Sequence, residues 1–187
     1  MKKFGLLLIL TALVVALGAG DGFAFKLGGQ EMVRNGSGRR TKSIFGTLYY
    51  ATLWVPASLK GKGGKELIEA NQPMMMVLTI DSSLITRERF VDATSEGFGK
   101  SAQAGYASAK KQAFLNLFNG MKFSKGDVVS MAYTPAGLTT SMRFKADGKT
   151  KVLGTIAGLD LKKALFAIWL GSKPIQDSLK ASLLKGQ

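Results

Sequence analysis

The first apolar stretch of the chain follows a short basic start. Lys2 and Lys3 precede a run that carries no charged residue until Asp21. A basic start, an apolar run and small residues after it are typical of a secretory signal peptide. The run loses its hydrophobicity at residues 18–20, short of the about 20 apolar residues that a membrane-spanning helix needs. The pattern therefore predicts a signal peptide rather than a membrane anchor.

Two cleavage positions fit the small residues at the end of this segment. Gly22 and Ala24 occupy the −3 and −1 positions of a cut after Ala24, and a cut after Gly20 is the alternative. We expect a signal peptide over residues 1–24 and one soluble domain over 25–187. An exported chain without cysteine suits a Gram-negative periplasm, where disulfides are permitted but not required.

Extended segments dominate the first part of the domain and return after its middle. β-Branched and aromatic residues bounded by turn signals predict strands at residues 25–32, 39–55, 74–80, 128–134 and 139–145, with a further strand after 148. The glycine-rich residues 35–38 predict a turn between the first two strands, since glycine supplies positive φ.

Segments with helical periodicity lie between the two groups of strands and at the end of the chain. It predicts helices at residues 87–96, 101–119, 161–170 and 174–186. Thr86 is a suitable N-cap for the first of them. The third is apolar on almost every side apart from Lys162 and Lys163, which is typical of a deeply buried helix.

The last hairpin carries many basic residues, and its register decides where they point. A three-residue loop at 146–148 would pair Met142 with Val152 and Arg143 with Lys151. This register gathers four cations on one solvated face, namely Arg143, Lys145, Lys149 and Lys151. Six or seven antiparallel strands with two pairs of helices give an α+β fold, in which the helices pack on one face of an antiparallel sheet.

Composition removes several kinds of chemistry. The 187 residues include neither histidine nor cysteine, and 26 basic residues against 12 acidic ones give a formal charge of +14. Without these two residue types the chain has no Ser-His-Asp triad, no thiol nucleophile, no disulfide and no imidazole or thiolate zinc site. We expect neither a metal nor a cofactor. Nucleic acid is not an expected partner of an exported chain whose basic residues are not interleaved with base-stacking aromatics.

One long motif resembles a known family. Residues 35–56 read NGSGRRTKSIFGTLYYATLWVP. This run is similar to the N-G-x-G-x-R-x-K-x-x-F opening, followed by Y-x-x-x-L-Y-x-P, of bacterial chalcone isomerase-like proteins. Further blocks follow in the family's order, including Lys125-Gly-Asp127 and the ALFAIWLG of residues 164–171. The resemblance covers nearly all of the domain.

The resemblance implies an antiparallel sheet with helices over one face and an apolar cleft between them. Plant chalcone isomerases of this superfamily close a chalcone to a flavanone, with an arginine positioning the phenolate. Plastid fatty-acid-binding relatives keep the arginine, pair it with a tyrosine, and hold a fatty-acid carboxylate without turnover. The resemblance leaves open which of these activities the present chain has.

Arg40 and Tyr49 match the arginine and the tyrosine of the motif. A guanidinium at the mouth of an apolar pocket can clamp a carboxylate or phenolate through its planar fork. Tyr49 and Tyr50 face opposite sides of a strand, so only one can reach a ligand, and we expect Tyr49. The alternatives are a surface arginine beside Arg39 and a tyrosine packed in the core. Lys42 could add positive potential on the face of Arg40.

The Thr86 helix departs from the enzymes. The resemblance places Phe90 and Gly97 where the plant enzymes carry a tyrosine and an asparagine seven residues apart. Phenylalanine donates no hydrogen bond and glycine has no side chain, so the polar network for cyclisation is missing.

Three functions follow from these observations. The first is a non-catalytic binder of a fatty acid or similar amphipathic anion, with Arg40 and Tyr49 as its ligand-binding residues. The second is an intramolecular lyase or isomerase that acts through the same two residues. The third is an interaction protein that places the basic face of the last hairpin on anionic lipid.

Overall fold

A single seven-stranded antiparallel sheet organises the molecule, with the strands in the order of the chain. The computed structural model describes residues 25–186. The strands are β1 (Phe25–Leu27), β2 (Gln30–Lys42), β3 (Gly46–Pro56), β4 (Met74–Ile80), β5 (Val128–Thr134), β6 (Gly137–Arg143) and β7 (Thr150–Ile156). The helices are α1 (Gly64–Glu69), α2 (Arg87–Gln103), α3 (Lys111–Asn116), α4 (Leu159–Leu170) and α5 (Asp177–Leu183).

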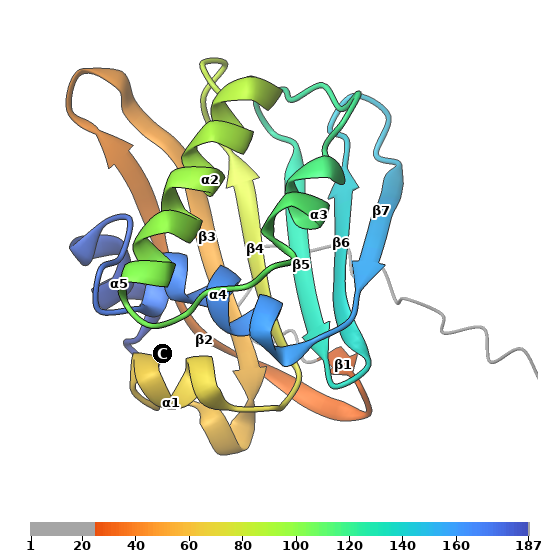
Figure 1. Ribbon diagram of the computed structural model, residues 1–187. Helices are drawn as coiled ribbons and strands as arrows, with labels where there is room; N and C mark the ends of the chain where they lie inside the picture. The colour runs from red at the N-terminus through yellow and green to blue at the C-terminus, as the bar shows by residue number, and fades with distance from the viewer. Residues whose placement is uncertain (1–24, 187) are drawn as a thin grey trace, which may run out of the picture.

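The helices α2, α3 and α4 cover one face of the sheet, and α5 lies beside β2 (Figure 1). This arrangement confirms the predicted α+β class. β4 has the predicted bounds, and the Thr86 hydroxyl accepts a hydrogen bond from the Arg89 amide at 3.3 Å, as expected of an N-cap. The predicted signal peptide, residues 1–24, lies outside the described residues.

The predicted turn at residues 35–38 is wrong, because these residues lie inside β2. Their glycines serve close approach rather than chain reversal. A Cβ atom at Gly36 would collide with the Ser182 carbonyl oxygen, and one at Gly38 would lie 2.7 Å from the Ser182 Cβ atom. Asn35 is buried and donates to the Leu183 carbonyl oxygen at 2.8 Å. Residues 35–38 of β2 therefore form the surface on which α5 packs.

The predicted continuous strand over residues 39–55 is also wrong. A short 3₁₀ turn at Ser43–Phe45 interrupts it, and Gly46 completes the reversal at φ 67°. Arg40 ends up on β2 and Tyr49 on β3, where the two residues are register partners. The correction brings the two predicted site residues directly opposite each other.

The predicted helix over residues 101–119 is two separate elements. α2 continues to Gln103, Gly105 then adopts φ 90°, and α3 begins only at Lys111. A left-handed glycine ends helices readily because it has no Cβ penalty, and here it turns one apolar stripe into two segments. Phe114 and Phe118 still reach the core.

The predicted register of the last hairpin is wrong by one residue. Met142 pairs with Lys151 and Arg143 with Thr150, and the ladder is irregular between Thr140 and Ser141. The Phe144 amide donates to the Lys149 carbonyl oxygen at 2.9 Å, so the loop holds four residues instead of three. The four cations of the predicted basic face are therefore not paired across the hairpin as expected.

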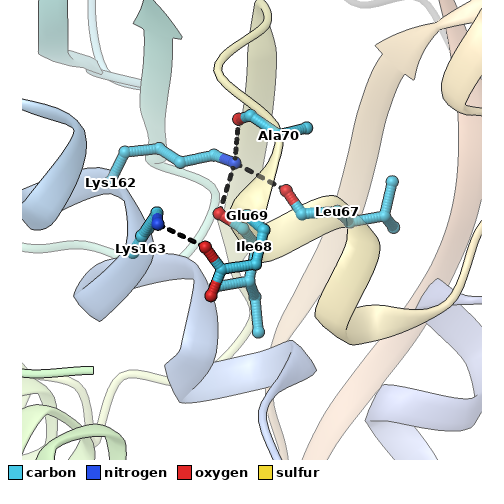
Figure 2. A network of polar contacts seen from close by, with 6 residues as sticks. All are labelled: Leu67, Ile68, Glu69, Ala70, Lys162 and Lys163. Atoms are coloured by element: carbon cyan, nitrogen blue, oxygen red, sulfur yellow. Dashed lines mark hydrogen bonds and ion pairs between the residues drawn. The ribbon is translucent and has the colours of Figure 1, made fainter. Parts of the chain in front are cut away.

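Helix α4 forms the centre of the core and contains an unexpected charge. Lys162 is completely buried, and its ammonium group donates to the carbonyl oxygens of Leu67 at 2.6 Å, Ile68 at 2.9 Å and Ala70 at 2.8 Å (Figure 2). These carbonyl groups belong to the C-terminal end of α1 and the residue after it, which otherwise lack helical partners. Lys162 thus fastens α1 to α4, while its neighbour Lys163 pairs with Glu69 nearer the surface.

Candidate functional site

A cavity of about 470 Å³ lies between α2, the β2–β3 hairpin and the C-terminal end of α4. Apolar side chains form most of its wall, namely Phe45, Leu48, Leu78, Leu84, Ile85, Phe90, Ile168 and Ile175. Its volume falls within the range of about 300–1,000 Å³ that is usual for small-molecule sites. Arg40, Tyr49 and Trp169 also line it.

Arg40 is half-buried and held by one edge of its guanidinium group. Its Nη1 atom donates to the Thr41 carbonyl oxygen at 2.8 Å and to the Gln176 Oε1 atom at 2.9 Å. The same Gln176 oxygen accepts from the Thr41 amide at 3.0 Å. Within residues 25–186 no acceptor bonds Nε or Nη2, and Arg40 lines the cavity. A carboxylate can take both in a bidentate arrangement.

Tyr49 faces Arg40 across the β2–β3 pair and is only 8% exposed. Its hydroxyl oxygen accepts a hydrogen bond from the Trp169 indole nitrogen at 3.1 Å. Burial raises the pKa of Tyr49 to about 12, although the Trp169 hydrogen bond and the nearby Arg40 charge oppose this rise. The phenol is therefore neutral near pH 7, and its proton is available for donation to an acceptor in the cavity.

The next residues of the two strands form a matching pair on the other side of the sheet. Arg39 pairs with Tyr50, and both are exposed, Tyr50 at 48%. This alternation confirms that Tyr49 and Tyr50 face opposite ways. Neither Arg39 nor Tyr50 lines the cavity, so the pair provides a natural control for Arg40 and Tyr49.

Both positions of α2 at which the resemblance predicted the loss of a polar pair, Phe90 and Gly97, face other parts of the core. Phe90 lies in the cavity lining and stacks on Phe123 with a ring-centroid separation of 4.8 Å. At Gly97 a Cβ atom would lie 2.7 Å from the Ile168 Cγ2 atom, so the close contact of α2 with α4 leaves little room for a side chain. The Thr94 hydroxyl donates to the Phe90 carbonyl oxygen at 2.7 Å.

Charged side chains of both signs stand at the exposed edge of the cavity. Lys42 lies over the Phe45 ring at 5.7 Å from its centroid, and Arg89 donates to the Leu84 carbonyl oxygen at 3.1 Å. Asp92 and Glu96 belong to the same edge, and Glu96 forms an ion pair with Lys100 at 3.1 Å. Of the three cations that line the cavity, Arg40 is the one whose register partner, Tyr49, is buried.

Two residues of the site were not singled out by the sequence. Trp169 lies within the block that carries the family resemblance, and a buried indole N–H needs an acceptor, so its partnership with a buried tyrosine could have been sought. Gln176, the residue just before α5, has no such signal. Its role depends on α5 docking beside the end of β2, which only the three-dimensional structure shows.

Comparison with solved structures finds a similar fold in a plant protein. The Arabidopsis thaliana fatty-acid binding protein AtFAP1 superposes with a TM-score of 0.65 and 18% sequence identity, and the match covers 88% of this chain and 93% of that one. At this identity the similarity establishes the fold alone. No curated protein matches the sequence. None of the helices within residues 25–186 has the length and apolar character needed to cross a membrane.

A family comparison agrees with the long motif and with the fold. The family described as chalcone isomerase-like matches residues 20–185, which is almost the whole domain and includes both Arg40 and Tyr49. The chain therefore belongs to the chalcone isomerase-like family.

Proposed function

We propose that this protein is a non-catalytic binder of a fatty acid or a similar amphipathic anion. The observation that carries the proposal is the pairing of Arg40 and Tyr49 at the wall of a mainly apolar cavity whose other charged side chains stand at its exposed edge. Within residues 25–186 both side chains retain hydrogen-bond donors that no protein acceptor bonds, namely Nε and Nη2 of Arg40 and the O–H of Tyr49. A polar head and a long apolar body are the two features that such a cavity accommodates.

The carboxylate would be held by two kinds of donor. The Nε and Nη2 groups of Arg40 supply a planar fork, and the neutral phenol of Tyr49 supplies an O–H. Gln176 and Thr41 hold the guanidinium from behind through its Nη1 atom, so little side-chain freedom is lost when the ligand binds. Preorganisation of this kind lowers the entropic cost of binding.

The acyl chain would occupy the apolar part of the cavity. Leu48 and Leu78 contribute from the sheet, Phe90 from α2, and Ile168 from α4. Each CH₂ group buried there contributes about 0.8 kcal/mol. The similarity of the fold to that of a fatty-acid binding protein supports the same ligand class.

An isomerase of the chalcone isomerase type is the second candidate, because Arg40 and Tyr49 face each other as a phenolate-binding pair could. The wall of α2 argues against it. Phe90 offers no hydrogen bond, position 97 has no side chain, and Thr94 donates its hydroxyl hydrogen to the Phe90 carbonyl oxygen. Tyr49, with its pKa raised to about 12, is protonated near pH 7 and is therefore a donor rather than a base.

Native mass spectrometry of the protein purified from the cells that produce it tests the proposal. We expect a mass increment that corresponds to an acyl chain, present in the wild type and in Arg39→Ala and lost in Arg40→Ala. Retention of the same ligand by Arg40→Ala would contradict the assignment. An empty protein that cyclises a chalcone, with the activity lost in Arg40→Ala and kept in Arg39→Ala, would replace the binder by the isomerase.

We place this binder in the periplasm on the pattern of residues 1–24 alone. Cell fractionation, with N-terminal sequencing of the purified protein, should locate it there and show a chain that begins at Phe25, or at Asp21 for the alternative cut. A protein that keeps Met1 would contradict the cleavage.

A further inference from the structure

The end of the sheet at which the cavity is exposed carries an unusual group of apolar side chains. Within residues 25–186 five large apolar side chains are exposed, and three of them lie at this end: Ile44 at 87%, Phe45 at 46% and Leu84 at 37%. Phe45 and Leu84 also line the cavity. Exposed apolar residues gathered around a pocket mark a surface that another apolar phase covers.

The chain topology places these residues together. The strands pair in chain order and antiparallel, so the β2–β3, β4–β5 and β6–β7 connections all leave the sheet at the same end. Ile44 and Phe45 form the tip of the first connection, and Leu84 lies in the second, just before α2. Figure 1 shows this end at the top, with the β2–β3 loop and the loop before α2 as separate projections.

We propose that this end of the molecule docks on the surface of an anionic lipid bilayer, with Ile44, Phe45 and Leu84 entering the headgroup region. We call these three side chains the lipid-docking tip. This surface shares Lys145 with the basic face that the sequence predicted on the β6–β7 hairpin, but its apolar side chains belong to the β2–β3 and β4–β5 connections.

The charges around the lipid-docking tip favour an anionic surface. Three acidic residues of these connections form ion pairs, namely Asp81 with Lys125 at 3.0 Å, Glu88 with Arg87 at 3.3 Å, and Asp147 with Lys149 at 3.7 Å. A fourth, Asp127, is buried and accepts hydrogen bonds from the backbone amides of Ser124 and Lys145. No carboxylate among the described residues forms an ion pair with Lys42, Arg89 or Lys145. Asp92 and Glu96 stand at the exposed edge of the cavity further along α2, where Glu96 pairs with Lys100 at 3.1 Å. At the end of the sheet itself the three cations without an ion pair outnumber the one such carboxylate of the connections, that of the buried Asp127, so the net charge there is positive.

Neither the apolar nor the basic component suffices alone. Three partly exposed side chains bury little area, and a few lysines and arginines attract a bilayer only within a Debye length. Peripheral binding increases with apolar area and with attraction to anionic headgroups together. The lipid-docking tip combines both around one cavity, which distinguishes it from the remaining basic surface of a chain with a formal charge of +14.

Docking in this orientation would open the cavity toward the bilayer. An amphipathic anion could then pass between the membrane and the cavity without crossing water. This consequence rests on the proposed fatty-acid function, whereas the docking itself depends only on the surface.

Flotation with lipid vesicles tests the docking, using phosphatidylglycerol–phosphatidylethanolamine vesicles and pure phosphatidylcholine vesicles as probes. We expect the full-length mature protein to bind the anionic vesicles at least tenfold more strongly, with the difference falling steeply as salt increases. Ile44→Glu should reduce this binding at least tenfold. Val152→Glu introduces the same charge at another exposed apolar residue, on β7, and should bind like the wild type.

The outcomes separate this proposal from its alternatives. Equal binding by Ile44→Glu and Val152→Glu, or no preference for anionic vesicles, would overturn it. Loss of a dimer in Ile44→Glu, without any vesicle binding by the wild type, would assign the surface to a second copy of the chain instead. Ile44 does not line the cavity, so fatty-acid affinity in solution should be unchanged in Ile44→Glu. Vesicle binding by a protein that takes up no fatty acid would leave the docking intact and reject the proposed function.

Discussion

A cation lies near each end of α4, and the two cations differ in how many of their N–H donors the protein bonds. Near its N-terminal end, Lys162 is fully buried and donates to three carbonyl oxygens, one for each N–H of an ammonium group. Near its C-terminal end, beside Trp169, Arg40 bonds protein acceptors through Nη1 alone. Lys162 therefore stabilises the fold, and Arg40 is equipped to bind something else. The difference between the two cations is therefore one of hydrogen-bond donors: the protein bonds all three of Lys162 and leaves Nε and Nη2 of Arg40 without a protein acceptor.

Replacement of Lys162 should have the largest effect. Lys162→Met keeps most of the apolar stem but leaves three carbonyl groups, two of them buried, without their donor, and each buried group costs about 1–3 kcal/mol. We expect a decrease of about 3 kcal/mol in the free energy of unfolding, measured by urea denaturation. Lys163→Met, one residue along, breaks only the partly exposed pair with Glu69 and should lose far less. Equal losses would show that Lys162 has no special structural role.

Lys162 should also make the stability of the protein depend on pH. Burial lowers the pKa of Lys162 to about 7 from 10.5. Between these two values the unfolded chain holds a proton that the folded chain has released, so stability rises with pH. The slope should reach at most about 1.4 kcal/mol per pH unit.

Urea denaturation of the wild type and of Lys162→Met at several pH values measures this slope. The difference between the two proteins isolates Lys162 from the other titrating groups. A difference that does not change with pH would mean that the three carbonyl groups keep the ammonium form above pH 10.

Arginine at position 40 should be needed for its shape as well as its charge. Arg40→Lys preserves the cation but loses the planar fork, so we expect about tenfold weaker fatty-acid binding, or about 1.4 kcal/mol. Displacement of a fluorescent fatty acid measures the affinity. Arg39→Lys, on the exposed side of the same strand, should bind as the wild type does; a loss there as large as at position 40 would favour general electrostatic attraction over a clamp.

Removal of the Tyr49 hydroxyl should change fatty-acid affinity less than Arg40→Lys does. Tyr49→Phe removes one donor to the carboxylate, which is worth about 1 kcal/mol or roughly a fivefold change in affinity. It also leaves the Trp169 indole without its acceptor, so the free energy of unfolding should be measured in parallel. Tyr50→Phe is the matched control. Unchanged affinity in Tyr49→Phe, with only stability reduced, would make Tyr49 a partner of Trp169 alone.

Sequence patterns predicted the fold class because the strands and helices differ clearly in period and composition. Glycine was the main source of error. Gly36 and Gly38 indicated a turn, but they allow close approach of α5 within a strand, and Gly105 ended a helix whose apolar stripe continues beyond it. A glycine in the sequence indicates that the backbone needs freedom or space at that position, but not whether the cause is a turn, a close contact or the end of a helix. The register of the β6–β7 hairpin failed for a related reason, since the ladder irregularity leaves Leu153 of β7 without a partner, directly beside Gly154.

The candidate site was predicted in part. Arg40 and Tyr49 line the cavity as the motif suggested, and their role in binding stays a prediction. Lys162 was expected only as an interruption of an apolar helix, because sequence cannot show that the carbonyl groups at the end of α1 surround it. Gln176 was missed since its contact with Arg40 joins residues 136 positions apart.

The contact between α5 and β2 has a consequence for the order in which the protein folds. Every strand pairs with its neighbour in the chain, so the sheet can form by successive additions, the longest step being from β4 to β5 across the segment that holds α2 and α3. The segment that brings Gln176 to Arg40 comes last and closes onto one of the first strands. A nascent chain would thus complete its sheet before its arginine is oriented, and the cavity would become competent for binding only at the final step of folding.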